Sequence, residues 1–241
     1  MKYQLDGHTH TLASGHAYNS ILEMVKIAEE RGLDFLGITD HAPSMPGTCD
    51  AIYFNNLGMV ETDEFNIEVA LGIELNIMDF HGNIDMHEQI LKKMDICIAS
   101  LHGPCIQAGT IEENTSAVIG AIKNPYVNII GHPDDGYYPL DYEKVVKAAK
   151  ENHKLLEVNN NSLNPAGFRL NTYENDKAML EVCKVYNQPI VIGSDAHWIS
   201  QVGRHDRAKK LIDNIKFPYE LVMNYDLEQF RGYINKYRRN F

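Results

Sequence analysis

The stretch Ile190-Val-Ile-Gly-Ser-Asp-Ala-His197 is a short apolar run followed at once by an acidic side chain and a histidine. A continuous apolar run of this length is typical of a strand that is buried on both faces. The same pattern recurs along the chain, where most of the other apolar runs also end in a histidine or a glutamate. The seven predicted strands are Tyr3–Gly7, Phe35–Thr39, Glu68–Ile73, Ile96–Ala99, Val127–Ile130, Leu155–Val158 and Ile190–Gly193.

Amphipathic stretches separate these runs and predict helices. Ser20-Ile-Leu-Glu23 matches a capping box that begins the helix Ile21–Arg31, and Gly32 is placed to end it. The other predicted helices are Asp85–Met94, Ile111–Ile122, Tyr142–Asn152, Glu174–Tyr186, His205–Asn214 and Leu227–Tyr237. Alternation of strand and helix predicts an α/β fold with a parallel sheet. Seven such units favour a distorted (β/α)7 TIM-like barrel formed by a single domain, residues 1–241, with a doubly wound open sheet as the alternative.

The longest irregular stretch is Ala42–Asn66, which contains two prolines and two glycines. A connection this long inside a compact domain is uncommon unless it has a function. It therefore counts mildly against this assignment of elements, unless it is a functional lid with a short helix inside it.

Composition excludes several classes of protein. Of the 241 residues, 44% are hydrophobic and 23% are charged, as in soluble globular proteins. The first residues lack the apolar region of a secretory signal, and no apolar run reaches the length of a membrane span, so we expect a cytoplasmic protein. Four cysteines without CxxC spacing are expected to be reduced thiols. A net charge of −11 disfavours nucleic acid or an anionic membrane as partner, and the basic cluster Lys236-Tyr-Arg-Arg239 is confined to the carboxyl end.

The polar residues that follow the predicted strands are of metal-ligand type. Six of the seven predicted strands end in such residues, which are His8 and His10, His41, Glu74, His102, His132, and finally Asp195 and His197. In parallel α/β folds the carboxyl ends of the strands meet on one face, which holds the active site. The pairs His8/His10 and Asp195/His197 have i, i+2 spacing, so both members of a pair point the same way in extended backbone. The sequence therefore predicts a metal site at this face.

The remaining histidines do not follow strands. His81, His87, His153 and His205 lie in predicted loops or helices and are expected on the surface. His16 lies in a polar loop shortly after His10, where it fits a ligand or a surface residue equally well.

In order along the chain, these motifs resemble the motif series of the PHP (polymerase and histidinol phosphatase) superfamily, and more narrowly its bacterial YcdX-like phosphatases. The motifs are His8-Thr-His10 with the downstream His16, Thr39-Asp-His41, Glu74, Ser100-Leu-His102, Gly131-His-Pro133 and Gly193-Ser-Asp-Ala-His197. The resemblance implies a (β/α)7 barrel that holds three divalent ions. One ion would be bound by His8, His10, Glu74 and Asp195, a second by Glu74, His102 and His132, and a third by His16, His41 and His197.

Such a site predicts a phosphatase. Imidazole and carboxylate ligands suit Zn²⁺ first, with Mn²⁺ or Fe²⁺ as alternatives. With two anionic ligands, three divalent ions leave a charge of about +4, which calls for a polyanionic substrate. We expect a metal-activated water to cleave a small-molecule phosphate monoester and release inorganic phosphate, with Glu74 and Asp195 as the catalytic carboxylates and Arg169 as a phosphate-binding residue.

Three other functions remain open from the sequence. They are phosphodiester cleavage by a 3′-5′ nuclease, amide or lactone hydrolysis on an amidohydrolase-like barrel, and metal binding without catalysis. A nuclease needs a basic track with aromatic side chains, and an amidohydrolase usually needs fewer metal ions. The sequence does not settle the oligomeric state.

Overall fold

The computed structural model describes residues 3–238, so Arg239 of the basic cluster lies outside the described residues. Within them, parallel strands form two sheets. The first sheet has the order β1 (Leu5–Asp6), β2 (Phe35–Ile38) and β3 (Glu68–Leu71). The second runs through β4 (Ile73–Asn76), β5 (Cys97–Ser100), β6 (Ile129–Ile130), β7 (Leu155–Asn159) and β8 (Ile190–Gly193). The structure thus confirms the α/β fold with parallel strands.

One predicted strand is two strands in the structure. The sequence predicted a single strand over Glu68–Ile73, but it is divided at Gly72 into β3 and β4. The Gly72 amide donates to Ile38 of β2, whereas the next amide, that of Ile73, donates to Ile96 beside β5. A Cβ at Gly72 would lie 2.1 Å from the Ile96 carbonyl oxygen, so only glycine permits this exchange of partners. As a consequence Glu74 lies inside β4 rather than after a strand.

The two sheets do not form one continuous closed sheet among residues 3–238. They are joined at both edges by isolated bridges, His41 with Glu74 and Thr9 with Ala196. The backbone amides of His10 and Asp195 donate across the second junction, to Ala196 and His8 respectively. The residues after β1 and the residues after β8 are therefore held side by side, although they are far apart in the sequence.

The strands enclose a common apolar interior. Every strand except β4 contributes a buried side chain to one cluster, and the carboxyl-terminal segment adds Met223, Phe230 and Ile234 to it. The members from the strands and their margins are Leu5, Phe35, Ala70, Ile96, Ile98, Ile129, Leu155 and Val191. A larger apolar cluster lies between the strands and the helices outside them.

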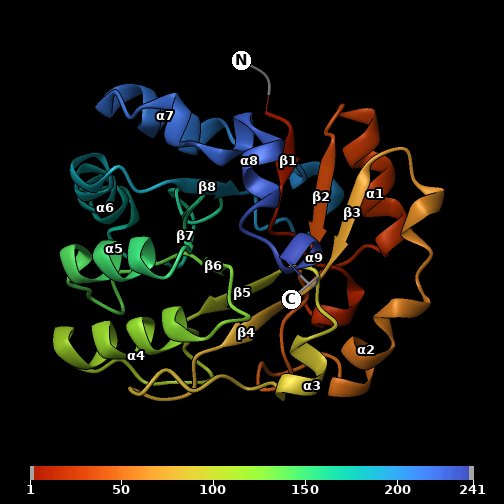
Figure 1. The fold of residues 1–241 in the computed structure, drawn as a ribbon, viewed down its shortest axis with the longest axis horizontal. Helices are drawn as coiled ribbons and strands as arrows, with labels where there is room; N and C mark the ends of the chain where they lie inside the picture. Colours follow the sequence, from red (N-terminus) through yellow and green to blue (C-terminus); the bar gives the residue numbers. More distant parts are fainter. Residues whose placement is uncertain (1–2, 239–241) are drawn as a thin grey trace.

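The helices cover the outside of the sheets. Figure 1 shows α4 to α7 along one side of the strands, α1 and α2 along the other, and α8 and α9 overlying the strands in this view. Their bounds are α1 Ile21–Glu30, α2 Ala51–Asn56, α3 Glu88–Leu91, α4 Ile111–Lys123, α5 Tyr142–Glu151, α6 Thr172–Tyr186, α7 Asp206–Ile215, α8 Leu227–Arg231 and α9 Asn235–Arg238. None of the helices within residues 3–238 has the length and apolar character that a membrane crossing requires.

Most predicted helices are present with small changes at their ends. The capping box of α1 forms as expected, with both Ser20–Glu23 hydrogen bonds, and Gly32 follows with φ +69°. Two predictions were too long, because α3 covers only part of Asp85–Met94 and the last helix is divided into α8 and α9. The segment Ala42–Asn66 contains the short helix α2. None of the four cysteines, all within the described residues, forms a disulfide.

Candidate metal centre

The predicted ligands converge at the carboxyl ends of the strands. Glu74 lies at their centre, and five imidazoles approach its carboxylate. The shortest distances are 2.7 Å from His41 Nδ1 to Oε2, 3.0 Å from His132 Nε2 to Oε1 and 3.2 Å from His102 Nε2 to Oε1; His8 and His10 lie 3.5 Å away through Nε2. The Glu74 side chain is buried, so this cluster lies at the bottom of the site rather than on its rim.

Asp195 forms a second point of convergence. Its Oδ1 lies 3.2 Å from His10 Nε2, 3.5 Å from His197 Nδ1 and 3.8 Å from His8 Nε2. His16 is more exposed and approaches through its ring, which stacks with His41 and His197 at centroid distances of 4.9 and 4.8 Å. All nine predicted ligand residues therefore gather at one place.

Three groups of these side chains have ligand atoms within 4.8 Å of one another. They are His8/His10/Glu74, His41/Glu74/His102 and His10/His41/His197. The first group corresponds to three of the four ligands expected for the first ion. The other two combine residues that the resemblance assigns to different ions, because His41 lies between Glu74 and the less buried His16 and His197.

Neighbouring acceptors fix the orientation of three of the histidines. His8 Nδ1 lies 2.7 Å from Glu157 Oε1, His10 Nδ1 lies 2.9 Å from Ser14 Oγ, and His102 Nδ1 lies 2.7 Å from Asn76 Oδ1. The Ser14 hydroxyl itself donates to Asp40, at 2.6 Å. Each Nδ1–H is therefore the donor, which leaves the Nε2 lone pair directed into the cluster. This arrangement is the usual one for histidines that bind metal ions.

Three buried atoms of the cluster that lack hydrogen bonds are also suited to bind cations. Among the described residues, His41 Nδ1, Glu74 Oε2 and His102 Nε2 are buried and make no hydrogen bond of acceptable geometry. Buried polar atoms in native proteins are nearly always satisfied. Divalent cations would satisfy all three atoms together.

The electrostatics favour the ligand protonation states of Glu74, Asp195 and His102. At His8, by contrast, Glu157 and Glu74 outweigh the effect of burial and raise the pKa well above its ordinary value. Burial alone would raise the pKa of Glu74, but His102, His41 and His8 outweigh it and hold that pKa well below its usual range. Burial likewise opposes ionisation of Asp195, but His8 and His10 lower its pKa well below the ordinary value. Burial lowers the pKa of His102 to about 4, despite the opposing effect of Glu74. The carboxylates are therefore ionised and His102 is neutral, as metal ligands must be.

A cavity of about 420 Å³ opens above the cluster. Its wall includes His16, His41, His102, Asp195 and His197, together with Arg169 and an apolar part formed by Met45, Leu101, Pro104 and Phe168. Met45 comes from the irregular segment Ala42–Asn66. Arg169 Nη1 donates to Asp195 Oδ2 at 3.2 Å and to Ser162 Oγ at 2.9 Å. Burial disfavours the guanidinium charge, but the nearby Asp195 outweighs this and raises the pKa of Arg169.

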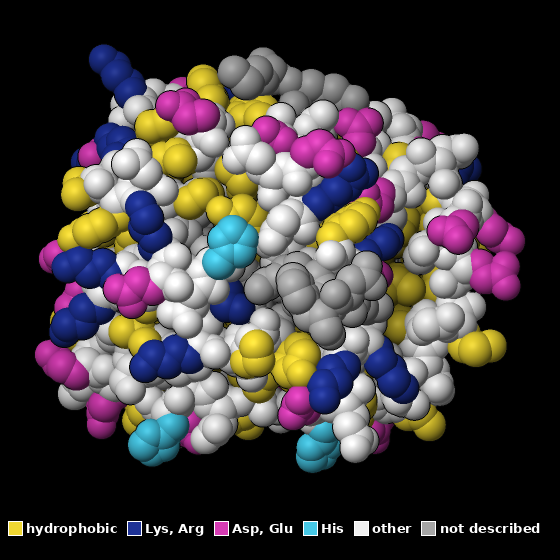
Figure 2. Space-filling model, viewed as in Figure 1, with side chains coloured by type: hydrophobic (Ala, Val, Ile, Leu, Met, Phe, Trp, Pro, Cys, Tyr) yellow, Lys and Arg dark blue, Asp and Glu magenta, His cyan; other side chains and the backbone are white. Residues whose placement is uncertain are grey.

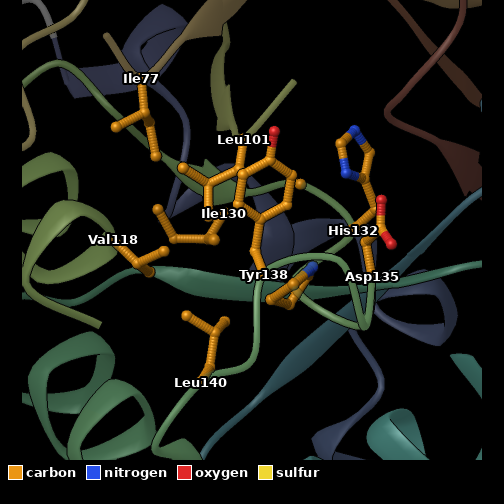
Figure 3. A pocket seen from close by; sticks show the side chains of 10 residues that line it. Ile77, Leu101, Val118, Ile130, His132, Asp135, Tyr138 and Leu140 are labelled. Atoms are coloured by element: carbon orange, nitrogen blue, oxygen red, sulfur yellow. The ribbon is translucent and has the colours of Figure 1, made fainter. Parts of the chain in front are cut away.

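His132 lies beside the apolar core. A small cavity of about 10 Å³ lies next to it. Figure 3 shows His132 and Asp135 on one side of this cavity, and Ile77, Val118 and Leu140 on the other. This cavity has space for about one water molecule among mostly apolar side chains.

Glu157 of the centre and the burial of His205 were not predicted from the sequence. Glu157 of β7 is buried beside His8 and His132, although β7 was the strand without a predicted ligand. A glutamate within the apolar run Leu155–Val158 was the available signal, because charged residues are rarely buried without partners. His205, expected on the surface, is 2% exposed, because it packs against Tyr3 and lies near Asp6. His81, His87 and His153 are exposed, as expected.

Comparison with known proteins identifies the family of this chain. The model of the PHP domain matches residues 6–164, well over half of the chain. The chain belongs to the PHP domain family. A relative from Acetivibrio thermocellus, named "Probable phosphatase", is 44% identical over 98% of this chain and 97% of its own length. A relative of the same name from Caldicellulosiruptor bescii is 46% identical over 97% and 96%.

Solved structures share the fold at low sequence identity. Histidinol phosphate phosphatase from Lactococcus lactis, solved as a complex with zinc, L-histidinol and phosphate, has a TM-score of 0.61 at 18% identity, covering 90% of this chain and 95% of its own. A chain in an archaeal ribonuclease P complex with mature tRNA has a TM-score of 0.59 at 15% identity, with coverage of 95% and 91%. At these identities the likeness concerns the fold alone.

Proposed function

We propose that this PHP domain protein is a metal-dependent phosphatase that hydrolyses a small-molecule phosphate monoester and releases inorganic phosphate. The observation that carries the proposal is the approach of five imidazoles to the single buried carboxylate of Glu74, at the bottom of a cavity that also contains Arg169. The relatives named as phosphatases, and a structural neighbour crystallised with zinc and phosphate, support it.

The proposal includes a trinuclear centre. His8, His10, Glu74 and Asp195 would hold one ion, Glu74, His102 and His132 the second, and His16, His41 and His197 the third. Zn²⁺ is our first choice, with Mn²⁺ or Fe²⁺ as alternatives for the same ligands. Glu74 and Asp195 are the proposed catalytic carboxylates, because each lies between imidazoles of more than one ion site. We further propose that residues 1–241 form one domain, in which the two bridged sheets act as a distorted seven-unit barrel.

Bound divalent ions would lower the pKa of a water molecule and neutralise charge on the phosphoryl oxygens. The chain's own residues orient the ester. Both hydrogen bonds of Arg169 to Ser162 and Asp195 use Nη1, so the other guanidinium donors can bind phosphoryl oxygens. The apolar wall of Met45, Leu101, Pro104 and Phe168 would exclude water and contact the carbon part of the ester.

Bound metal and phosphate release together test the proposal. We expect metal analysis to find three divalent ions per chain, and the loaded protein to release phosphate from an aryl phosphate and from some members of a panel of metabolite monoesters. Absence of metal, or absence of phosphate release from every monoester, would contradict it.

The face of the molecule drawn in Figure 2 offers no basic track to a nucleic acid among its described residues. Figure 2 shows Lys and Arg side chains interspersed with Asp and Glu over the face in view, without a continuous basic track among the described residues there. The same assays would detect a nuclease, since it would cleave a bis-ester or an oligonucleotide and leave monoesters intact. An amidohydrolase-like hydrolase would be recognised by fewer bound ions and by activity on amides or lactones.

Arg169 provides a test of substrate binding. We expect Arg169→Ala to raise KM for a phosphate monoester by about 10- to 100-fold, because hydrogen bonds to charged groups contribute about 1.5–3 kcal/mol. Steady-state kinetics would measure KM, and metal analysis would check that the loss of the contact with Asp195 leaves the ions in place. Arg204→Ala, at an exposed arginine, is the control. An unchanged KM in Arg169→Ala would remove this residue from the phosphate site.

A further inference from the structure

Glu157 is a buried carboxylate that none of the proposed ion sites includes. It lies in β7, where Leu155, Glu157 and Asn159 alternate toward the interior of the strands. Leu155 belongs to the apolar interior cluster, whereas Glu157 lies at the level of the candidate ligands and is 1% exposed. A carboxylate buried in this way is costly unless hydrogen bonds satisfy both of its oxygens.

The Glu157 carboxylate links three candidate ligands. Its Oε1 accepts from His8 Nδ1 at 2.7 Å, and its Oε2 accepts from the backbone amide of His132 at 2.8 Å. Oε2 also accepts from Asn159 Nδ2 at 3.1 Å, and that amide group lies 3.3 Å from Asp195 Oδ2. Because protein N–H groups occupy both oxygens, Glu157 acts through its neighbours rather than as a ligand.

The backbone around Glu157 is strained and shaped to its carboxylate. His132 and Asp195 have φ values of +29° and +52°, in a region that non-glycine residues rarely adopt. The His132 amide that donates to Glu157 belongs to this strained backbone. At Gly193, a Cβ would lie 1.9 Å from Glu157 Oε1, so the glycine leaves the space that the carboxylate occupies.

We propose that Glu157 is a positioning residue of the metal centre, which directs His8 Nε2 toward the ions and holds His132 in its strained conformation. This inference rests on the metal centre of the proposed function. Its physical basis is that an acceptor at Nδ1 fixes both the tautomer and the ring orientation of a histidine ligand and increases the basicity of the other nitrogen. A single carboxylate thereby aligns His8, which follows β1, and His132, which follows β6, as ligands of two different ions.

Two substitutions at Glu157 test the inference. Glutamine keeps the size of the side chain, but it has one acceptor and one donor group, so either His8 or the His132 amide loses its acceptor. Alanine removes both acceptors. We expect Zn²⁺ affinity, measured by competition with a chromophoric chelator on the full chain, to fall by about 10- to 100-fold in Glu157→Gln and further in Glu157→Ala. The activity of Glu157→Gln should recover in part when Zn²⁺ is raised to saturation.

A second readout does not depend on activity. In the Zn²⁺-loaded wild-type protein, the Nδ1 proton of His8 should be protected from exchange with water by its bond to Glu157, and therefore visible by NMR. We expect this signal to broaden or disappear in Glu157→Ala. A residue that merely stabilised the fold would leave it unchanged.

Asp176→Asn is the matched control. Asp176 is a fully buried carboxylate in α6, and its oxygens make no hydrogen bond among the described residues. This variant should bind Zn²⁺ as the wild type does. Wild-type affinity in Glu157→Gln would overturn the inference and leave the proposed function intact. Failure of the wild-type protein to bind Zn²⁺ or to release phosphate would instead overturn the proposed function.

Discussion

Glu74→Gln is expected to lower kcat for phosphate monoesters by roughly 10³-fold or more, because the ions it helps to hold contribute several kcal/mol of transition-state stabilisation. The reason is that the Glu74 carboxylate lies within 3.5 Å of the imidazoles of five other proposed ligands. Glutamine preserves the volume of the side chain and an acceptor for the Ser100 hydroxyl, which donates to Glu74 at 2.7 Å. Glutamine lacks the negative charge of the carboxylate, and its amide cannot bind both of the ions that are assigned to Glu74.

The measurement combines kinetics with metal analysis. We expect Glu74→Gln to retain the wild-type circular dichroism spectrum and to lose at least one bound ion per chain. Glu68→Gln, a substitution on the neighbouring strand β3 at a carboxylate that contacts Arg231, should keep both metal and activity. His197→Ala is a second test at the opposite side of the cluster. Full turnover in both Glu74→Gln and His197→Ala would exclude the proposed centre.

Removal of the metal ions is expected to abolish activity and to lower the melting temperature. A ligand at 100 times its Kd stabilises the folded state by about 2.7 kcal/mol per site, which corresponds to a shift of roughly 5–11 °C for a chain of this length. The structure predicts a loss in this direction, because without ions the buried His41 Nδ1, Glu74 Oε2 and His102 Nε2 have no hydrogen-bond partner among the described residues.

Thermal melting before and after dialysis against a chelator would measure the shift. Addition of Zn²⁺ or Mn²⁺ should restore both the melting temperature and phosphate release. Mg²⁺ is the control, because it prefers oxygen ligands and the cluster is rich in imidazole nitrogen. If the chelated protein melts at the original temperature and remains active, the ions are not part of the folded enzyme.

The positions of the ligands were predictable because they follow strand ends. His8, His41, His102, His132 and Asp195 all lie just beyond the strands that the apolar runs indicated. Parallel strands bring their carboxyl ends together whatever the length of the connections, so the convergence did not require knowledge of the loops. The number of ions and the way the ligands divide among them remain predictions.

Other features depended on contacts that a linear pattern does not contain. The division of one predicted strand at Gly72 follows from the approach of the Ile96 carbonyl, which only the folded chain brings there. Glu157 was overlooked because its role lies in the hydrogen bonds to His8 and His132 from distant strands. His205 was placed on the surface because nothing local indicates that Tyr3 and Asp6 would enclose it.

The contribution of Phe230 and Ile234 to the interior cluster has a consequence for biosynthesis. Thr9, after β1, pairs with Ala196, after β8, and the inner core is completed by side chains that lie still farther along the chain. Contacts between such distant segments make folding slow, because the entropy of closing long loops is lost before the contacts form. We therefore expect the interior to stay open, and the ion sites to stay unformed, until the segment that carries Phe230 and Ile234 has left the ribosome.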